Sequence, residues 1–223
     1  MSSTLRQMFS EIYDRLQTHF GPTHWWPGDT PFEIAVGAIL VQNTAWVNVE
    51  KAIRNLKAAD MLYPTSILHA DEAALQKLLR PSGFFRVKSV RLRNFCRYFV
   101  ERYDGDFERM AERSLEELRA ELLQVPGIGP ETADDILLYA CNKPVFVVDA
   151  YTRRMLSRHG LAKSAMPYEE LRALFERNLD SDLHMFKEYH GLIVSAGKDF
   201  CRRAPKCELC PLGPMLKNGR PKQ

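Results

Sequence analysis

A tight Pro/Gly turn between two helical segments constrains this chain more than any other feature. Residues 114–123 are typical of an amphipathic helix, and Ser114 with Glu117 forms a capping box at its start. The sequence PGIGP at residues 126–130 ends that helix, and its two glycines can take positive φ. A second helix is predicted over 131–142, with a proline in its first turn. The two helices are therefore expected to form a hairpin.

The same turn has the features of an anion-binding site. Backbone N–H groups at the start of the second helix lack intrahelical acceptors, and the helix dipole favours negative charge there. A nucleic-acid phosphate is such an anion, and glycine leaves room for its approach. A plain helix–helix turn is the alternative interpretation of PGIGP.

The rest of the chain is also helical in pattern. The segment from Thr30, TPFEIAVGAILVQ, begins with a cap and a proline and is apolar nearly all round, which indicates a buried central helix. The longest run typical of a strand is VFVV at 145–148, and one short run does not make a sheet. We therefore predict an all-α fold. Further helices are expected over 3–19, 46–59, 71–79, 86–103, 150–159, 167–177 and 182–198.

The basic residues are concentrated in two segments. The net charge is only +3, but residues 80–102 hold seven Lys or Arg against one acid. Residues 198–223 hold seven against two. This segregation suits a surface that meets a polyanion. A solvated helix face and a polar tail would explain it equally well.

An aspartate follows the hairpin at a short distance. In VVDAYTRR, residues 147–154, Asp149 stands at the predicted N-cap of the next helix. Capping alone would explain a single Asp there. A functional role is inferred from its spacing relative to the hairpin.

Residues 114–156 resemble the helix-hairpin-helix and Gly/Pro…Asp signature of the endonuclease III superfamily of DNA glycosylases. The resemblance extends over roughly residues 5–212 and includes the segment GFFRVK at 83–88. It implies two helical lobes that flank a DNA-binding cleft, a barrel lobe of residues 27–135 and a second lobe of residues 1–26 plus 136–223. It also implies that the damaged nucleotide is flipped out of duplex DNA. The positions assigned to DNA contact are Gln42, which would fill the gap left by the flipped base, and Lys88, Pro126, Gly127, Ile128, Gly129 and Thr132.

The chain departs from the family where strand-cleaving members have a lysine. Those members read PGxGxKTA, and this chain has Glu131 at the lysine position. A carboxylate cannot form the imine that strand cleavage requires. The resemblance therefore implies hydrolysis of the glycosidic bond, with Asp149 stabilising the positive charge that develops on the sugar and Glu131 as a candidate assistant.

All three tryptophans lie near the cleft that the resemblance implies. Trp25, Trp26 and Trp46 would line a base pocket with Lys198 at its edge, by similarity to the bacterial 3-methyladenine glycosylase branch. Aromatic rings attract cationic alkylated purines. The alternative is that these tryptophans are core or interface anchors.

The C-terminal cysteines are one short of a complete cluster motif. Cys201, Cys207 and Cys210 stand where many relatives hold a [4Fe–4S] cluster, but the fourth cysteine is missing. Three outcomes stay open: a cluster with an unusual fourth ligand, zinc bound with His190 or His184, or no metal. Cys96 and Cys141 are predicted to be buried structural thiols.

The expected protein is a monofunctional base-excision-repair glycosylase for alkylated purines such as 3-methyladenine. Two alternatives remain, an endonuclease III-type enzyme for oxidised pyrimidines or mismatched thymine with weak lyase activity, and a lesion-binding module without catalysis. The expected partner is damaged double-stranded DNA. No apolar run approaches the ~20 residues that cross a bilayer. We expect a monomer in the cytoplasm or, more broadly, inside the cell.

Overall fold

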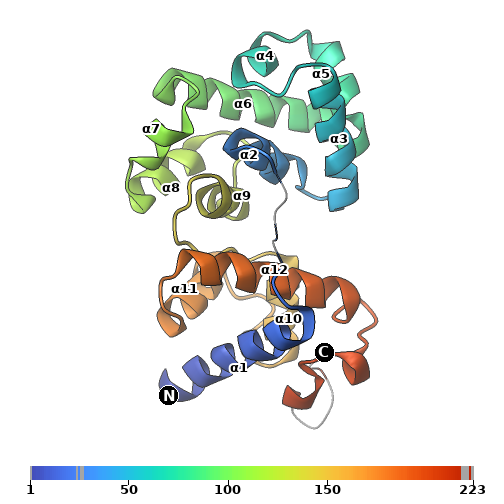
Figure 1. Ribbon diagram of the computed structural model, residues 1–223, viewed down its shortest axis with the longest axis vertical. Helices are drawn as coiled ribbons and strands as arrows, with labels where there is room; N and C mark the ends of the chain where they lie inside the picture. The colour runs from blue at the N-terminus through green and yellow to red at the C-terminus, as the bar shows by residue number, and fades with distance from the viewer. Residues whose placement is uncertain (1, 24, 26–27, 217–220, 222–223) are drawn as a thin grey trace. The chain divides into compact units, whose positions relative to one another are not determined.

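The computed structural model describes residues 2–23, 25, 28–216 and 221. Within these ranges the chain forms helices and no strand, which confirms the predicted all-α fold. Contacts divide the chain into two units, Pro27–Lys143 and the combination of Met1–Trp26 with Pro144–Gln223 (Figure 1). None of the helices in the described ranges has the length and apolar character needed to span a membrane.

The unit Pro27–Lys143 is built around a buried helix. This helix, α2 (Pro31–Leu40), begins where Thr30 accepts a hydrogen bond from the Glu33 backbone and Pro31 occupies the first turn, as predicted. Most of its apolar residues are almost fully buried, so it forms the centre of the unit. The helices that follow it are α3 (Trp46–Ala58), α4 (Pro64–His69), α5 (Glu72–Leu79), α6 (Phe85–Tyr103), α7 (Phe107–Ala111), α8 (Leu115–Gln124) and α9 (Pro130–Asp135).

The second hairpin helix does not end where α9 ends. It continues as a π-helical segment, Ile136–Ala140, all of whose residues are buried and which packs against α2. This segment belongs to the same unit as α9 for that reason. The unit therefore ends at Lys143, whereas the sequence suggested a boundary at residue 135.

The other unit joins the N-terminal helix to the last third of the chain. It contains α1 (Ser2–Phe20), α10 (Ala150–Arg158), α11 (Tyr168–Asn178) and α12 (Leu183–Asp199). Helix α12 packs against both α1 and α10 (Figure 1). Two short 3₁₀ turns, Cys207–Leu209 and Gly213–Met215, follow it.

The run VFVV at 145–148 is buried but does not form a strand. The ring of Phe146 stacks on Phe175 of α11 with a centroid distance of 3.8 Å. Apolar packing against a helix therefore explains the β-like composition. The two helices absent from the sequence prediction, α4 and α7, are six and five residues long, too short to show a clear apolar period.

Candidate active site and nucleic-acid interface

The hairpin turn joins α8 to α9 with its tip exposed. The capping box of Ser114 and Glu117 is present as predicted. Gly127 has φ +99°, and a Cβ built on it would lie 2.3 Å from Arg91 Cγ, so this position requires glycine. Gly129 has φ −94°, which corrects the expectation of positive φ at both glycines. A Cβ on Gly129 would meet no atom within 4 Å, so the space beside it is open.

The two hairpin helices are joined by a buried ion pair. Arg119 of α8 donates from Nε to Asp134 Oδ1 of α9 at 2.7 Å and from Nη2 to Oδ2 at 3.2 Å. The Asp134 side chain is fully buried and the Arg119 side chain is 14% exposed. This two-point contact fixes the angle between the helices that flank the turn. The sequence analysis did not predict this ion pair, although Asp134, a charged residue in a largely apolar helix, was a signal for it.

Gln42 and Arg91 tie the hairpin to the rest of its unit. Gln42 Nε2 donates to the Gly127 carbonyl at 3.2 Å and to Thr132 Oγ1 at 2.9 Å. Arg91 donates in turn to Gln42 Oε1. Gln42 is therefore engaged within the unit, and its predicted contact with DNA would require these bonds to be exchanged. Thr132 is 5% exposed, as is Ile128, so both support the turn from inside.

Lys88 is placed differently from the expectation of DNA contact. Its side chain is buried, and Nζ donates to the Leu40 carbonyl at 2.8 Å and to the Ser82 carbonyl at 2.7 Å. Burial, with the nearby Arg91, lowers the pKa of this lysine to about 8. The ammonium group therefore joins the end of α2 to the loop before α6. We revise its role from phosphate contact to support of that loop.

Fewer basic side chains of residues 80–102 are free to meet a phosphate than the sequence suggests. Lys88, Arg91, Arg93 and Arg102 bond to carbonyl, amide or carboxylate groups of the same unit. The remaining three are exposed, and they are Arg80, Arg86 and Arg97. In residues 198–223, Lys217, Arg220 and Lys222 lie outside the described residues.

Asp149 occupies the N-cap of α10, as predicted. Its Oδ1 accepts from the Thr152 backbone N–H at 2.7 Å and from Thr152 Oγ1 at 2.8 Å. His190 of α12, 3% exposed, lies with Nε2 3.9 Å from Asp149 Oδ2. Burial would raise the pKa of the Asp149 carboxyl, but His190 and Thr152 outweigh it and hold the pKa below its usual value. The group is therefore an anion that is 14% exposed.

His190 was considered in the sequence only as a zinc ligand. Its placement beside Asp149 gives it a different partner. A histidine directly before the apolar run GLIV of α12 was the available signal. The sequence analysis also gave no role to Glu188 of the same helix. Glu188 accepts a hydrogen bond from the Thr23 backbone N–H at 2.8 Å and so fixes the segment that leads to Trp25.

The four residues of the predicted base pocket fall in different parts of the chain. Lys198 Nζ lies 4.4 Å from the centre of the Trp25 ring, and both residues belong to the same unit. A Cβ on Gly191 would lie 2.4 Å from Trp25 Cβ, so the tryptophan is packed directly on α12. Trp46 begins α3 in the other unit. Trp26 lies outside the described residues.

Glu131 is exposed in the first turn of α9, where the helix dipole favours its charge. The structure therefore supplies a local reason for a carboxylate at this position. Its proposed assistance to Asp149 remains a prediction.

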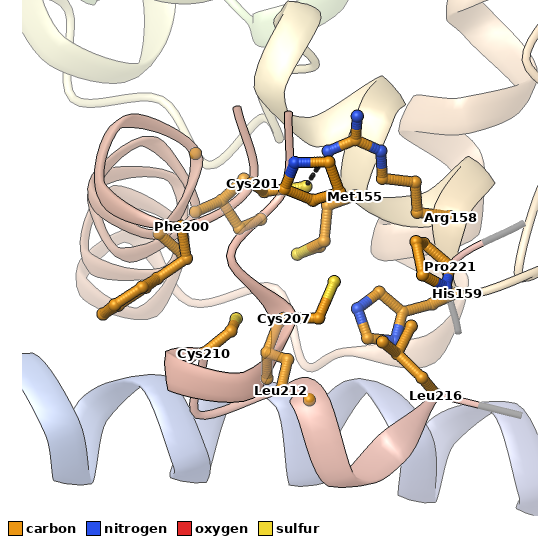
Figure 2. A pocket seen from close by; sticks show the side chains of 15 residues that line it. Met155, Arg158, His159, Phe200, Cys201, Cys207, Cys210, Leu212, Leu216 and Pro221 are labelled. Carbon is orange, nitrogen blue, oxygen red and sulfur yellow. Dashed lines mark hydrogen bonds between the residues drawn. The ribbon is translucent and has the colours of Figure 1, made fainter. Parts of the chain in front are cut away.

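The three C-terminal cysteines line one pocket beside α10. Figure 2 shows Cys201, Cys207 and Cys210 around a space that Met155 and His159 also face. Arg158 Nη1 donates to Cys201 Sγ at 3.2 Å. Burial raises the pKa of the Cys210 thiol, although backbone N–H groups of Leu212 and Gly213 donate to it. In the described part of the chain, no three His, Cys, Asp or Glu side chains are placed to hold a single metal ion.

The histidines named as zinc ligands do not reach this pocket. His184 is exposed in the first turn of α12, and at 1.5 Å per residue it lies about 22 Å along the helix from Asp199. His190 lies beside Asp149. His159, which the sequence reasoning did not consider, lines the pocket instead. Cys96 and Cys141 are buried in helical segments, as predicted.

Comparison with known proteins identifies the family. The model of the HhH-GPD superfamily of base excision DNA repair proteins matches residues 36–181, which include the hairpin and Asp149. The chain belongs to the HhH-GPD superfamily. Its members are DNA repair glycosylases, so this HhH-GPD protein is a DNA N-glycosylase.

Three similar proteins illustrate the relationship. A protein of Methanocaldococcus jannaschii, provisionally named a DNA repair glycosylase, is 49% identical over 92% of this chain and 94% of its own. Endonuclease III of Thermotoga maritima is 33% identical over 84% of this chain and 81% of its own. The solved H. pylori 3-methyladenine DNA glycosylase, bound to 1,N6-ethenoadenine, has a TM-score of 0.72 and 30% identity, covering 87% of this chain and 97% of its own. The predicted endonuclease III-like family is confirmed.

Proposed function

We propose that this HhH-GPD protein is a monofunctional glycosylase that removes alkylated purines from double-stranded DNA. The observation that carries the proposal is the Asp149 carboxylate, which is nearly buried and whose pKa lies below its usual value. An anion so placed stabilises the positive charge that builds on the sugar as the glycosidic bond breaks.

The proposed reaction is a hydrolysis. The bond between C1′ and the base nitrogen breaks, and its electron pair leaves with the base. The oxygen of a water molecule bonds to C1′, and Asp149 accepts the proton that the water loses. An alkylated purine already carries positive charge, so it departs as a neutral molecule without general-acid help.

The hairpin supports the absence of strand cleavage. Cleavage by β-elimination needs an amine that attacks C1′, and the first turn of α9 presents Glu131 instead. The carboxylate can neither form an imine nor be trapped on DNA by borohydride. We therefore infer that base release leaves an intact abasic strand.

The choice of an alkylated purine is supported by two observations. The H. pylori relative is named a 3-methyladenine glycosylase, and it matches most of this chain at 30% identity. Trp25 is held firmly on α12 with Lys198 above its ring. We propose that the other face of Trp25 stacks on the flipped base, while Lys198 stays over the first face at the edge of the pocket.

DNA binding is assigned to the hairpin and to nearby arginines. The open space beside Gly129 lets a phosphate approach the backbone N–H groups of the turn. Arg80, Arg86 and Arg97 are exposed cations of residues 80–102. Phosphate contacts of this kind position the duplex without reading its sequence.

The substrate proposal is tested with a panel of duplexes that carry 3-methyladenine, thymine glycol or a G·T mismatch. Base release is scored with and without hot alkali. We expect release of 3-methyladenine, and strand breaks only after alkali. Release of thymine glycol or mismatched thymine alone would favour an endonuclease III-type activity, which the 33% identity to that enzyme makes the second candidate.

Asp149→Asn supplies the control for catalysis. It keeps an N-cap acceptor for Thr152 but removes the charge, so base release should fall by at least about 100-fold while DNA binding persists. Undiminished turnover would overturn the catalytic assignment.

Glu131 is tested by a matched pair of variants. Glu131→Lys introduces the amine that strand cleavage needs. We expect this variant to form an imine with the sugar, which borohydride traps as a protein–DNA adduct. Glu131→Gln removes the carboxylate without adding an amine and should give no trapped product. Trapping by the unmodified protein would contradict the monofunctional proposal.

A further inference from the structure

Thr23 and Trp25 are held against one face of α12. Glu188 Oε2 accepts hydrogen bonds from the Thr23 backbone N–H at 2.8 Å and from Thr23 Oγ1 at 3.2 Å. Gly191 follows Glu188 by three residues, so the two share a face of the helix. A Cβ on Gly191 would lie 2.5 Å from Thr23 Oγ1 and 2.4 Å from Trp25 Cβ. Both residues therefore lie directly on α12, which fixes the position of the Trp25 ring.

Lys198 covers one face of this ring. It stands seven residues after Gly191, so its side chain leaves α12 on the same face of the helix. Its Nζ lies 4.4 Å from the centre of the Trp25 ring, a distance typical of a cation–π contact. The ammonium group occupies this face of the ring, so a planar base can stack only on the opposite one.

The charge of Lys198 is close enough to act on a base stacked there. Such a base lies roughly 3.5 Å beyond the ring, which places it about 8 Å from the ammonium group. At an effective dielectric constant of about 20, two unit charges at that distance change a rate by roughly 30-fold. Lys198 is exposed, so solvent and salt weaken the interaction, and we expect an effect of about tenfold.

Cleavage of the glycosidic bond changes the charge on the base. The electron pair of the bond between C1′ and the base nitrogen moves to the base, so an uncharged base becomes negative and a cationic base becomes neutral. An uncharged base is therefore attracted to Lys198 in the transition state, where that attraction lowers the barrier. A cationic base is repelled when it binds, and cleavage only relieves that repulsion.

We propose that Lys198 is a specificity-determining residue whose charge, acting across the Trp25 ring, favours the release of uncharged purine bases relative to cationic ones. The site then accepts both classes, because a cationic base leaves without help and an uncharged one leaves with the help of Lys198. This proposal rests on the position given to the flipped base under the proposed function.

The experiment compares two duplexes that differ only in the lesion, cationic 3-methyladenine and uncharged 1,N6-ethenoadenine. The readout is kcat/KM for base release by the full chain. Lys198→Met should lower kcat/KM on ethenoadenine about tenfold and change it less than about twofold on 3-methyladenine. On 3-methyladenine, kcat and KM should fall together, because the substitution removes a repulsion that cleavage had relieved.

Two further variants separate the charge from the packing of the side chain. Lys198→Arg keeps the charge and should stay within about threefold of the unmodified protein on both lesions. Lys163→Met removes an exposed lysine elsewhere in the same unit and should leave both values unchanged. Thermal melting checks that each variant is folded, which the exposure of Lys198 favours.

Three results would overturn the proposal: no release of ethenoadenine by the unmodified protein, equal losses on both lesions in Lys198→Met, or the same losses in Lys198→Arg as in Lys198→Met. Equal losses would show that Lys198 only supports the Trp25 ring. Failure to release 3-methyladenine would contradict the proposed substrate instead, and the response of ethenoadenine release to the three variants would then decide the role of Lys198.

Discussion

At the scale of single residues, Asp149 combines a structural and a chemical role. It caps α10 through Thr152, and the same contacts help to keep the carboxyl ionised despite its burial. His190 adds to this effect from α12. The N-cap interpretation and the catalytic one are therefore not alternatives, because the hydrogen bonds of the cap favour the charge that the chemistry needs.

The first prediction concerns the pH dependence of base release. His190→Gln removes a group that lowers the pKa of Asp149, so that pKa should rise. Since the ionised form is active, the acid limb of kcat/KM against pH should move to higher pH, with little change near neutrality. Single-turnover rates on a 3-methyladenine duplex between acid and neutral pH measure the shift. His184→Gln, an exposed change in the same helix, should leave the limb in place.

At the scale of elements, the hairpin depends on side chains that lie outside its turn. Arg119 and Asp134 join its two helices, and Gln42 joins the turn to the end of α2. Arg91 lies against Gly127 and bonds to Gln42. The shape of the turn therefore results from α2, α6 and α8 together, and not from the glycines alone.

The second prediction tests the ion pair between the hairpin helices. Asp134→Asn removes the buried carboxylate that Arg119 contacts with two nitrogen atoms, which should lower the free energy of unfolding by roughly 3 kcal/mol. Chemical denaturation measures the loss. Glu11→Gln breaks the exposed pair with Arg15 and should change stability by less than about 0.5 kcal/mol. Equal effects of the two variants would contradict the structural role of Asp134.

The third prediction separates the two glycines of the turn. Gly127→Ala places a side chain at φ +99° and against Arg91, so stability should fall by roughly 1–3 kcal/mol. Gly129→Ala has an ordinary φ and open space, so stability should be unchanged. We nevertheless expect Gly129→Ala to weaken DNA binding about tenfold, because its methyl group occupies the path of the phosphate. Fluorescence anisotropy and thermal melting together distinguish the two effects.

At the scale of the whole molecule, the mild net charge of +3 hides an uneven distribution. Much of the positive charge in residues 80–102 is used within its own unit, so the number of phosphate contacts is smaller than the sequence count. Binding to duplex DNA should therefore show a modest dependence on salt.

The fourth prediction quantifies that dependence. For each exposed arginine that contacts a phosphate, replacement by Ala should reduce the slope of log K against log salt by about 0.9. Arg86→Ala and Arg97→Ala are the variants, and Lys51→Ala, exposed on α3, is the control. Titrations at several salt concentrations measure the slopes. Identical slopes for all three variants would show that residues 80–102 do not meet the DNA backbone.

The helices and the chemistry-bearing positions could be predicted from the sequence. A cap, a proline and a nearly continuous apolar run indicated α2, and local caps marked the starts of α8 and α10, because these signals act over a few residues. The short helices α4 and α7 could not be predicted, because their formation depends on packing against α6. The π-helical form of the segment after α9 could not be predicted either, because this segment is buried against α2.

By itself, the sequence determined that the chain is all-α, that it contains the hairpin, and that Asp149 follows the hairpin; the resemblance to the endonuclease III superfamily added that Glu131 stands at a lysine position. These features are local in the chain, so spacing and residue type suffice to read them. Only the tertiary structure decided that Lys88 is buried and supports a loop, that His190 lies beside Asp149, and that His159 shares a pocket with the three cysteines. Each of these depends on contacts between residues distant in sequence, which burial and packing create and which no local pattern encodes.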